Sequence, residues 1–218
     1  MFYDPDQYVF TNDFSDHYNL IKEELSSVLN IPLKALNEQT WAGERPNYLE
    51  SSFERNLAWK TYVFKFFGIS HLPNRESCPV ISRLLDKYPQ IVTAEFSLLE
   101  PDTHILPHRG YTGELLRAHL GMVIPKGNAA IKVEEDERSW SENKWLVFDD
   151  SKIHEAWNKT NEIRIVLMID FEPNESVQKA KEVCEDVLKR TNDQHMMDIA
   201  PNEEWLRWYR NGAFPLKV

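Results

Sequence analysis

The chain has 218 residues, two cysteines and a formal net charge of −10. This length is enough to bury a sizeable core in one domain, and the acidic balance disfavours nucleic-acid binding, which requires a basic face toward the phosphates. No apolar run approaches the roughly 18 residues of a membrane helix, and MFYDPDQYVF lacks the basic start of a signal peptide. We therefore expect a cytoplasmic protein without a membrane span, in which Cys78 and Cys184 are reduced thiols.

The order of hydrophobic patterns divides the chain into three zones. Residues 15–29 place apolar side chains at helical spacing, with Ser15 as the expected N-cap. The middle is rich in β-branched and aromatic residues, and Pro, Gly, Asn and Asp separate its runs. These strand-like runs are AWKTYVFKFFG, TAEFSLLEP, HLGMVIP, AAIKVEE, KWLVFDD, HEAWN and IRIVLMIDF. One short helix, PVISRLLDKY, interrupts them, and two helices follow, ESVQKAKEVCEDVLKR and NEEWLRWYRNG.

This pattern predicts a mainly β protein with flanking helices. Short strands with turns every 8–12 residues are typical of a sandwich, a jelly roll or a barrel, and the helices would cover one face of a sheet. We treat residues 1–218 as a single domain. It divides into an N-terminal helical or irregular segment (1–56), a β core (57–172) and C-terminal helices (173–218).

Two histidines stand at the ends of strand-like runs. His108 and His154 are far apart in sequence, but strands distant in sequence become neighbours in a jelly roll, so both side chains could meet at one metal. Imidazole binds Fe, Cu, Ni and Zn alike, and non-haem iron sites usually add a carboxylate. That carboxylate normally stands two residues after the first histidine, where this chain has Gly110. The alternative is that His108 is a turn residue and His154 a half-buried strand residue bonded to a carbonyl.

Arg164 lies ten residues after His154, among apolar neighbours. A guanidinium in such a run is expected to be partly buried, and a buried cation needs an anion. HEAWNKTNEIRIV resembles a hairpin around NKTN, which in one register sets His154 beside Arg164. The anion would be a bound carboxylate or, alternatively, Glu155 or Asp170 of the protein itself.

Four segments taken together resemble a known family. They are FSLLEPDTHILPHRG, LRAHLGMVIP, SWSENKWLVFDDSKIHEAWN and IRIVLMIDFEP. This part of the chain is similar to the aspartyl/asparaginyl β-hydroxylases, Fe(II)- and 2-oxoglutarate-dependent dioxygenases with a double-stranded β-helix fold (a jelly roll, or cupin-like barrel). The resemblance implies that His108 and His154 are the metal ligands and that Gly110 is a family feature, because this branch holds iron with two histidines. It also implies Fe(II) as cofactor, 2-oxoglutarate as co-substrate and O₂.

The same resemblance assigns the co-substrate site. Ser97 and Arg164 match the pair that binds the far carboxylate of 2-oxoglutarate, and Arg117 and His119 match residues near its other carboxylate, beside the iron. Residues 117 and 119 would lie on one face of a strand. We expect His104 to be structural or to contact a metal ligand rather than the metal.

The acidic pair Asp149 and Asp150 is likewise expected to be structural, because the family keeps such a pair there without using it on iron.

The expected reaction is hydroxylation of an unactivated carbon in an aspartyl- or asparaginyl-like residue, a free amino acid or a related small acid. The peptide hydroxylases carry a second arginine where this chain has Leu115, which argues against an aspartate substrate. Candidate substrate contacts are Arg109, Leu115 and Trp157. Other aromatic residues that could line the pocket, or belong to the core, are Trp41, Trp59, Tyr62 and Tyr111.

Two alternatives to a hydroxylase remain. An iron halogenase also leaves one ligand position of the metal to another group, in that case chloride. A non-catalytic cupin-like binding module is the other alternative, although the His-x-His motif of cupins is missing from this chain.

Overall fold

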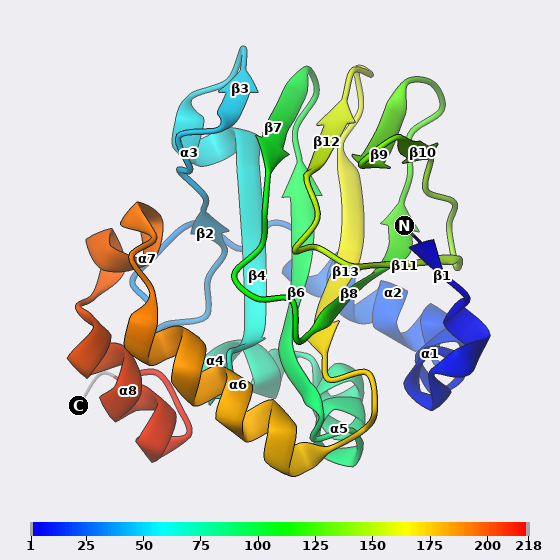
Figure 1. Ribbon diagram of the computed structural model, residues 1–218. Coiled ribbons are helices and arrows are strands. Elements are labelled where there is room, and N and C mark those ends of the chain that lie inside the picture. The colour runs from blue at the N-terminus through cyan, green and yellow to red at the C-terminus, as the bar shows by residue number, and fades with distance from the viewer. Residues whose placement is uncertain (1, 217–218) are drawn as a thin grey trace.

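The computed structural model describes residues 2–216, with the side chains of residues 55 and 56 left out. Two antiparallel sheets face each other (Figure 1). The larger sheet consists, in spatial order, of β1 (Phe2–Tyr3), β11 (Trp145–Phe148), β8 (Leu116–Val123), β13 (Arg164–Phe171), β6 (Ile91–Leu99), β4 (Trp59–Phe66) and β2 (Ala42–Gly43), with β5 (Ile69–Ser70) paired to β4. The smaller sheet consists of β10 (Asp136–Arg138), β9 (Ala129–Val133), β12 (His154–Asn158), β7 (Thr103–His108) and β3 (Leu49–Ser51).

The chain crosses between the sheets from β6 to β13. β6, β8, β11 and β13 belong to the larger sheet, whereas β7, β9, β10 and β12 belong to the smaller one. This alternation defines a double-stranded β-helix, so the predicted mainly β fold with flanking helices is confirmed. Strands β1, β2 and β3 come from the N-terminal segment and join the two sheets as well.

The predicted hairpin around NKTN is wrong. β12 pairs with β7 and β9, whereas β13 pairs with β6 and β8, so the two strands lie in different sheets. The chain turns a corner between them, and the amide of Asn158 donates hydrogen bonds to the carbonyls of Leu99, Glu100 and Glu162 there. A buried amide that satisfies three carbonyls stabilises this corner, which a two-residue hairpin turn would not need.

Alternate residues of the larger sheet face opposite sides. On β6, Ala94, Phe96 and Leu98 pack under the helices, whereas Glu95 and Ser97 point toward the smaller sheet. The strand period of two residues therefore places a polar row inside the barrel and an apolar row on its outside.

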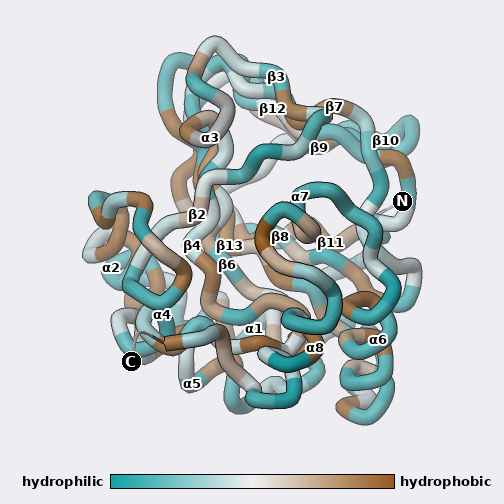
Figure 2. Tube along the Cα trace, turned by 90° about the vertical axis from the view of Figure 1, so that its left-hand side faces the viewer, coloured by the Kyte–Doolittle hydropathy of each residue, from teal (hydrophilic) through white to brown (hydrophobic). Residues whose placement is uncertain are grey.

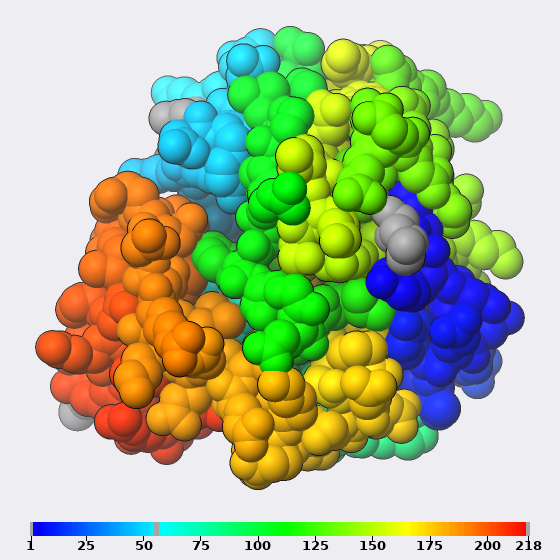
Figure 3. All heavy atoms as spheres, viewed as in Figure 1, coloured from blue at the N-terminus to red at the C-terminus, as the bar shows by residue number. Residues whose placement is uncertain are grey.

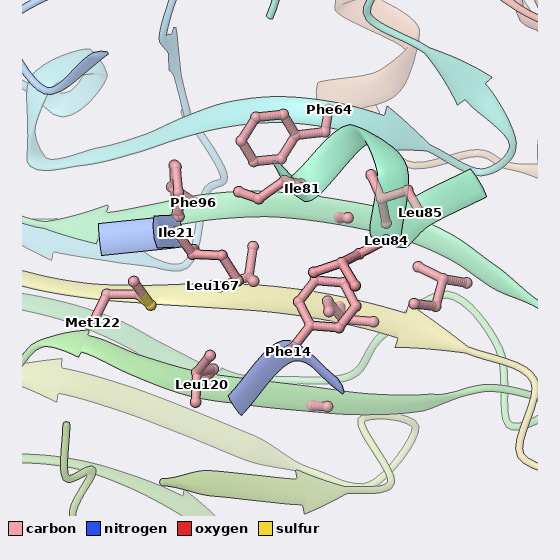
Figure 4. Packing of buried hydrophobic residues seen from close by; sticks show 14 of the residues in the cluster. Phe14, Ile21, Phe64, Ile81, Leu84, Leu85, Phe96, Leu120, Met122 and Leu167 are labelled. Atoms are coloured by element: carbon pink, nitrogen blue, oxygen red, sulfur yellow. The ribbon is translucent and has the colours of Figure 1, made fainter. Parts of the chain in front are cut away.

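Three helices cover the outer face of the larger sheet. They are α1 (Val9–Asp16), α2 (Tyr18–Val28) and α5 (Pro79–Lys87), and Figure 4 shows Phe14, Ile21, Ile81 and Leu84 against the sheet. The expected N-cap at Ser15 is wrong, because Ser15 lies inside α1 and its hydroxyl accepts a hydrogen bond from the indole of Trp145. The remaining short helical elements before β6 are η1 (Pro5–Gln7), α3 (Arg55–Ala58) and α4 (Leu72–Ser77).

The C-terminal helices pack at one end of the larger sheet. They are α6 (Val177–Arg190), α7 (Gln194–Ile199) and α8 (Asn202–Asn211). Hydrophilic and hydrophobic residues both recur along α6 and α8 in Figure 2, and the buried ones form a second core with Val92 and Leu115. Figure 3 shows this helical segment (orange) against the connection between β7 and β8 (green), where Lys179 forms an ion pair with Glu114.

Two further observations concern the whole described chain. Cys78 and Cys184 are buried and do not form a disulfide.

Within residues 2–216, none of the helices has the length and apolar character needed to cross a membrane.

Candidate active site

His108 and His154 meet on the inner face of the smaller sheet. They are paired across β7 and β12, next to a β-bulge, and their ring centroids are 4.2 Å apart. Nδ1 of His108 lies 2.9 Å from the carbonyl of Leu106, and Nδ1 of His154 lies 2.9 Å from the carbonyl of Lys152. Because a carbonyl only accepts, both Nδ1 atoms carry the proton and both Nε2 atoms keep a free lone pair. This is the tautomer that a metal ligand requires.

The surroundings keep both imidazoles neutral. Burial lowers the pKa of His108 to about 4 and that of His154, which also faces the first imidazole, to about 3. The ring of Tyr48 is stacked on His108 at a centroid distance of 4.3 Å and restricts its rotation. Among the described residues, no group of three or more His, Cys, Asp or Glu side chains forms a metal site. The free Nε2 atoms of the two histidines can serve as ligands to a divalent metal ion.

Gly110 stands beside the histidines because a side chain does not fit there. Its N–H donates a hydrogen bond to the carbonyl of Asp150, and a Cβ at position 110 would lie 2.1 Å from Oδ2 of Asp150. The carboxyl of Asp150 fills this space and lies 3.2 Å from Nη2 of Arg117. Burial raises the pKa of Asp150 to about 7, although Arg117 opposes this shift. The glycine is thus explained by close packing against Asp150.

Arg117 and His119 lie on the inner face of β8, as their spacing predicts. Nε and Nη2 of Arg117 donate to the two carboxylate oxygens of Asp170 at 2.7 and 2.9 Å. This two-point bond raises the pKa of Arg117, which also pairs with Asp150. Arg117 is therefore held by carboxylates of the protein, a partnership that the sequence did not indicate.

Arg164 is a buried cation without an acidic partner. Its side chain is 1% exposed and lies over the ring of Trp140 at 4.6 Å, and Nη1 donates to the carbonyl of Ser97 at 3.1 Å. Its Nε has no partner among the described residues. Burial lowers the pKa of Arg164 to about 9, so the guanidinium is still charged at neutral pH.

The alternative of an ion pair between Arg164 and an acidic residue of the protein is wrong. Asp170 pairs with Arg117, and Glu155 lies 2.8 Å from Nε2 of His104. A buried guanidinium that lacks a carboxylate is costly unless an anion from outside the chain binds to it.

A second unpartnered donor lies next to this cation. Nδ1 of His119 accepts a hydrogen bond from the indole of Trp140 at 3.2 Å, so Nε2 carries the proton, and Nε2 has no partner among the described residues. The hydroxyl of Ser97 accepts from the indole of Trp59 at 3.0 Å. Arg164 and His119 thus offer buried N–H groups to an oxygen-rich anion.

A cavity of about 850 Å³ connects the barrel mouth with the N-terminal loops and the C-terminal helices. His108, Arg109 and Arg117 line it together with Trp41, Trp59 and Tyr111. The segments 33–48 and 186–199 form its outer walls. Arg109 is exposed at the rim, and its Nη1 donates to the carbonyl of Ser151.

Three residues that the sequence analysis named as candidates near the substrate do not line the cavity. Trp157 faces away from His154 on the outside of β12, where its indole donates to Asn128 at 2.6 Å, and its substrate contact stays a prediction. Leu115 packs in the core of the C-terminal helices and does not line the cavity, so its substrate role stays a prediction. Tyr62 belongs to the helix-covered core.

Sequence reasoning missed Tyr48, Trp140 and Glu95. The first two act through aromatic contacts with His108, His119 and Arg164, which no motif encodes. Glu95 gave a usable signal, because the polar alternation Thr-Ala-Glu-Phe-Ser within an apolar strand predicts a polar inner row.

The inner face therefore combines a histidine pair with unpartnered buried donors inside a double-stranded β-helix, a combination that fits an oxygenase of this fold. The model of the aspartyl/asparaginyl β-hydroxylase family matches residues 15–173. The chain belongs to this family, and the resemblance of its motifs is confirmed.

Several of the curated relatives are named as hydroxylases. The ornithine lipid ester-linked acyl 2-hydroxylase of Rhizobium tropici is 34% identical over 176 residues, which cover 78% of this chain and 59% of that protein. The human aspartyl/asparaginyl β-hydroxylase is 36% identical over 105 residues, which cover 44% of this chain and 14% of that protein. The chain thus spans less than two thirds of either relative. A solved viral collagen prolyl hydroxylase from Paramecium bursaria Chlorella virus-1 aligns with a TM-score of 0.38 and 8% identity over 51% of this chain and 77% of that one.

Proposed function

We propose that this protein is an Fe(II)- and 2-oxoglutarate-dependent dioxygenase that hydroxylates an unactivated carbon. One observation carries the proposal: Arg164 is a buried cation without a carboxylate, inside the same barrel as two histidines with free Nε2 atoms. A dicarboxylate co-substrate supplies what this arrangement lacks. Membership of a hydroxylase family supports the same reaction.

The histidine pair would hold the iron. His108 and His154 are neutral at physiological pH, and their protonated Nδ1 atoms are fixed by backbone carbonyls, so neither ring must lose a proton or rotate to bind metal. Tyr48 limits the movement of His108 further. Iron bound there would supply the activation of O₂, for which side chains have no equivalent.

The co-substrate carboxylate farther from the metal would bind Arg164. Its Nε is free to donate, Nη1 is already oriented by the carbonyl of Ser97, and Trp140 covers the guanidinium. Hydrogen bonds to charged groups contribute roughly 1.5–3 kcal/mol each, and burial excludes competing water. The Nε2–H of His119 offers a further donor to the same ligand.

The substrate would occupy the cavity outside this pocket. A volume of about 850 Å³ exceeds what a five-carbon diacid requires, so a small molecule or a segment of a peptide can bind beside the co-substrate. The relatives act, by name, on aspartyl or asparaginyl residues and on an ornithine lipid, and both classes are candidates for this chain. Arg109 stands at the rim, where a substrate would enter.

The test is anaerobic loading with Fe(II) followed by 2-oxoglutarate and air. We expect consumption of 2-oxoglutarate and formation of succinate that depend on iron, and the gain of one oxygen atom in a substrate from a metabolite and peptide screen. Product identification in the presence and absence of chloride separates hydroxylation from halogenation. A protein that binds neither iron nor 2-oxoglutarate would contradict the proposal.

A further inference from the structure

Glu95 is a buried carboxyl on the inner face of β6, directed into the cavity. Its side chain is 5% exposed. It lines the cavity beside Val63 and Met168, its in-register partners on the two neighbouring strands. Its carboxyl takes part in no hydrogen bond or ion pair with any of residues 2–216 whose side chains are described. A carboxyl that opens on a cavity and has no partner from the chain can receive a ligand there.

The position of Glu95 separates it from the co-substrate pocket. Glu95 and Ser97 share one face of β6, and two residues of a strand span roughly 7 Å. Ser97 contacts Arg164 and Trp59, whereas Glu95 faces the wide cavity that also reaches His108. A group held by Glu95 would therefore lie in the substrate space beside the metal site.

No described neighbour of Glu95 supplies a cation that pairs with its carboxyl. Glu44 and Asp170 add to the effect of burial and raise its pKa far above the ordinary value, and Arg117 only partly opposes this. Arg117 cannot serve as the partner, since Asp170 already binds it at two points. Glu44 is bonded to His195 at 2.7 Å.

The other basic side chains of the cavity are paired or lie at its rim. Arg190 forms an ion pair with Asp186, and Lys34 forms one with Glu38. Arg45 and Arg109 are exposed. Among the described residues, the buried wall of the cavity thus offers Glu95 no cation that lacks a carboxylate of its own.

We propose that Glu95 is the anchor for a positively charged group of the substrate, a primary ammonium or a guanidinium. A cation placed there would donate charge-assisted hydrogen bonds to the carboxyl, while Glu44 and Asp170 add attraction. The same surroundings repel an acidic side chain. This assignment deepens the proposed function by naming its substrate class, and the anchoring itself requires neither iron nor 2-oxoglutarate.

Calorimetric titration of the full chain with matched amino acids tests the anchor. L-Lysine and L-norleucine have the same backbone and nearly the same length, but only lysine carries a side-chain ammonium; L-arginine and L-citrulline form a second pair. We expect the cationic member of at least one pair to bind about tenfold more tightly or better, which corresponds to 1.4 kcal/mol. In Glu95→Gln, which keeps the shape of the side chain, this preference should disappear.

Two controls identify the cause. Glu135→Gln removes an exposed carboxylate far from the cavity lining and should leave the preference intact. Circular dichroism verifies that both variants are folded.

The outcomes separate this inference from the proposed function. Selective binding of lysine or arginine without any turnover of 2-oxoglutarate would support Glu95 as the anchor and contradict the dioxygenase activity. Turnover of 2-oxoglutarate with equal binding of both members of each pair would support the dioxygenase activity and contradict the anchor. Preference for L-glutamate, a preference that persists in Glu95→Gln, or no binding of any cationic probe at millimolar concentrations would overturn the anchor.

Discussion

Two regions of the barrel interior hold unpartnered side chains, one basic and one acidic. Arg164 is a buried cation without an acid, and Glu95 is a buried acid without a cation, on neighbouring strands of one sheet. Arg164 is paired in register with Leu99, four residues from Glu95, so roughly 13 Å of strand separates the two positions. They are too far apart to neutralise each other. The comparison shows that the two proposed ligands, a dicarboxylate at Arg164 and a cation at Glu95, would bind at separate places in the interior.

The largest effect is expected at the proposed metal site, on which turnover depends. His108→Ala or His154→Ala should abolish binding of Fe(II) and all turnover, because one imidazole alone does not retain the ion. Metal content after dialysis, measured by mass spectrometry, checks this expectation. His104→Ala is the matched control, since His104 lies on the opposite face of β7 and pairs with Glu155. Equal metal loss in the control would place the ion elsewhere.

The next effect concerns Gly110, which borders the cavity. In Gly110→Ala the new Cβ would lie 2.1 Å from the carboxyl of Asp150, and the forced shift should destabilise the fold by about 1–3 kcal/mol. Chemical denaturation measures this change, and the double variant with Asp150→Ala should recover part of it. Gly113→Ala is the control, because its Cβ would meet only Ser151 at 3.4 Å. Wild-type stability of Gly110→Ala would show that Asp150 moves aside freely.

The variant Arg164→Lys tests whether the guanidinium of Arg164 binds 2-oxoglutarate. Lysine keeps the charge but loses the planar fork, so we expect the KM for 2-oxoglutarate to rise about tenfold, or 1.4 kcal/mol, with metal content unchanged. Arg138→Lys provides the control, since Arg138 also lies over an aromatic ring, that of Phe2, but is exposed. An unchanged KM in Arg164→Lys would remove Arg164 from the co-substrate site.

The smallest effect is the pH dependence of stability in the metal-free protein. The folded-state pKa values of His108 and His154, about 4 and about 3, lie below the ordinary value near 6.5. As the pH falls from 7 to 6, these histidines bind protons in the unfolded chain but not in the folded protein. The free energy of unfolding therefore falls by roughly 0.7 kcal/mol per histidine. Urea denaturation at both pH values should show this loss, with a shallower slope in His154→Ala. Identical slopes would mean that His154 titrates normally.

The sequence predicts the strands of the core and the shared face of Arg117 and His119, because the period of two residues is local information. It does not reveal that Trp157 points outward or that Leu115 packs against α6, because each depends on how a strand end meets another element. The hairpin prediction failed for the same reason: nearness in sequence favours pairing, but the crossover placed β12 and β13 in different sheets.

In the candidate site, too, the sequence predicts some residues, whereas others depend on tertiary contacts. Motifs identify His108, His154 and Arg164, since their residue types and order carry the chemistry. The partners that orient them, Tyr48 and Trp140, come from segments without a motif and are brought near only by the closed barrel.

The place of β13 in the sheet has a consequence for folding. β13 is the last strand of the barrel in sequence, yet it lies between β6 and β8, so the pairing of residues 91–99 with 164–171 closes a long loop. During synthesis on the ribosome, β6 and β8 must wait with open edges until residue 171 has emerged, and open edges invite pairing with other chains. We therefore expect slow barrel closure, and aggregation of nascent chains that stop before β13.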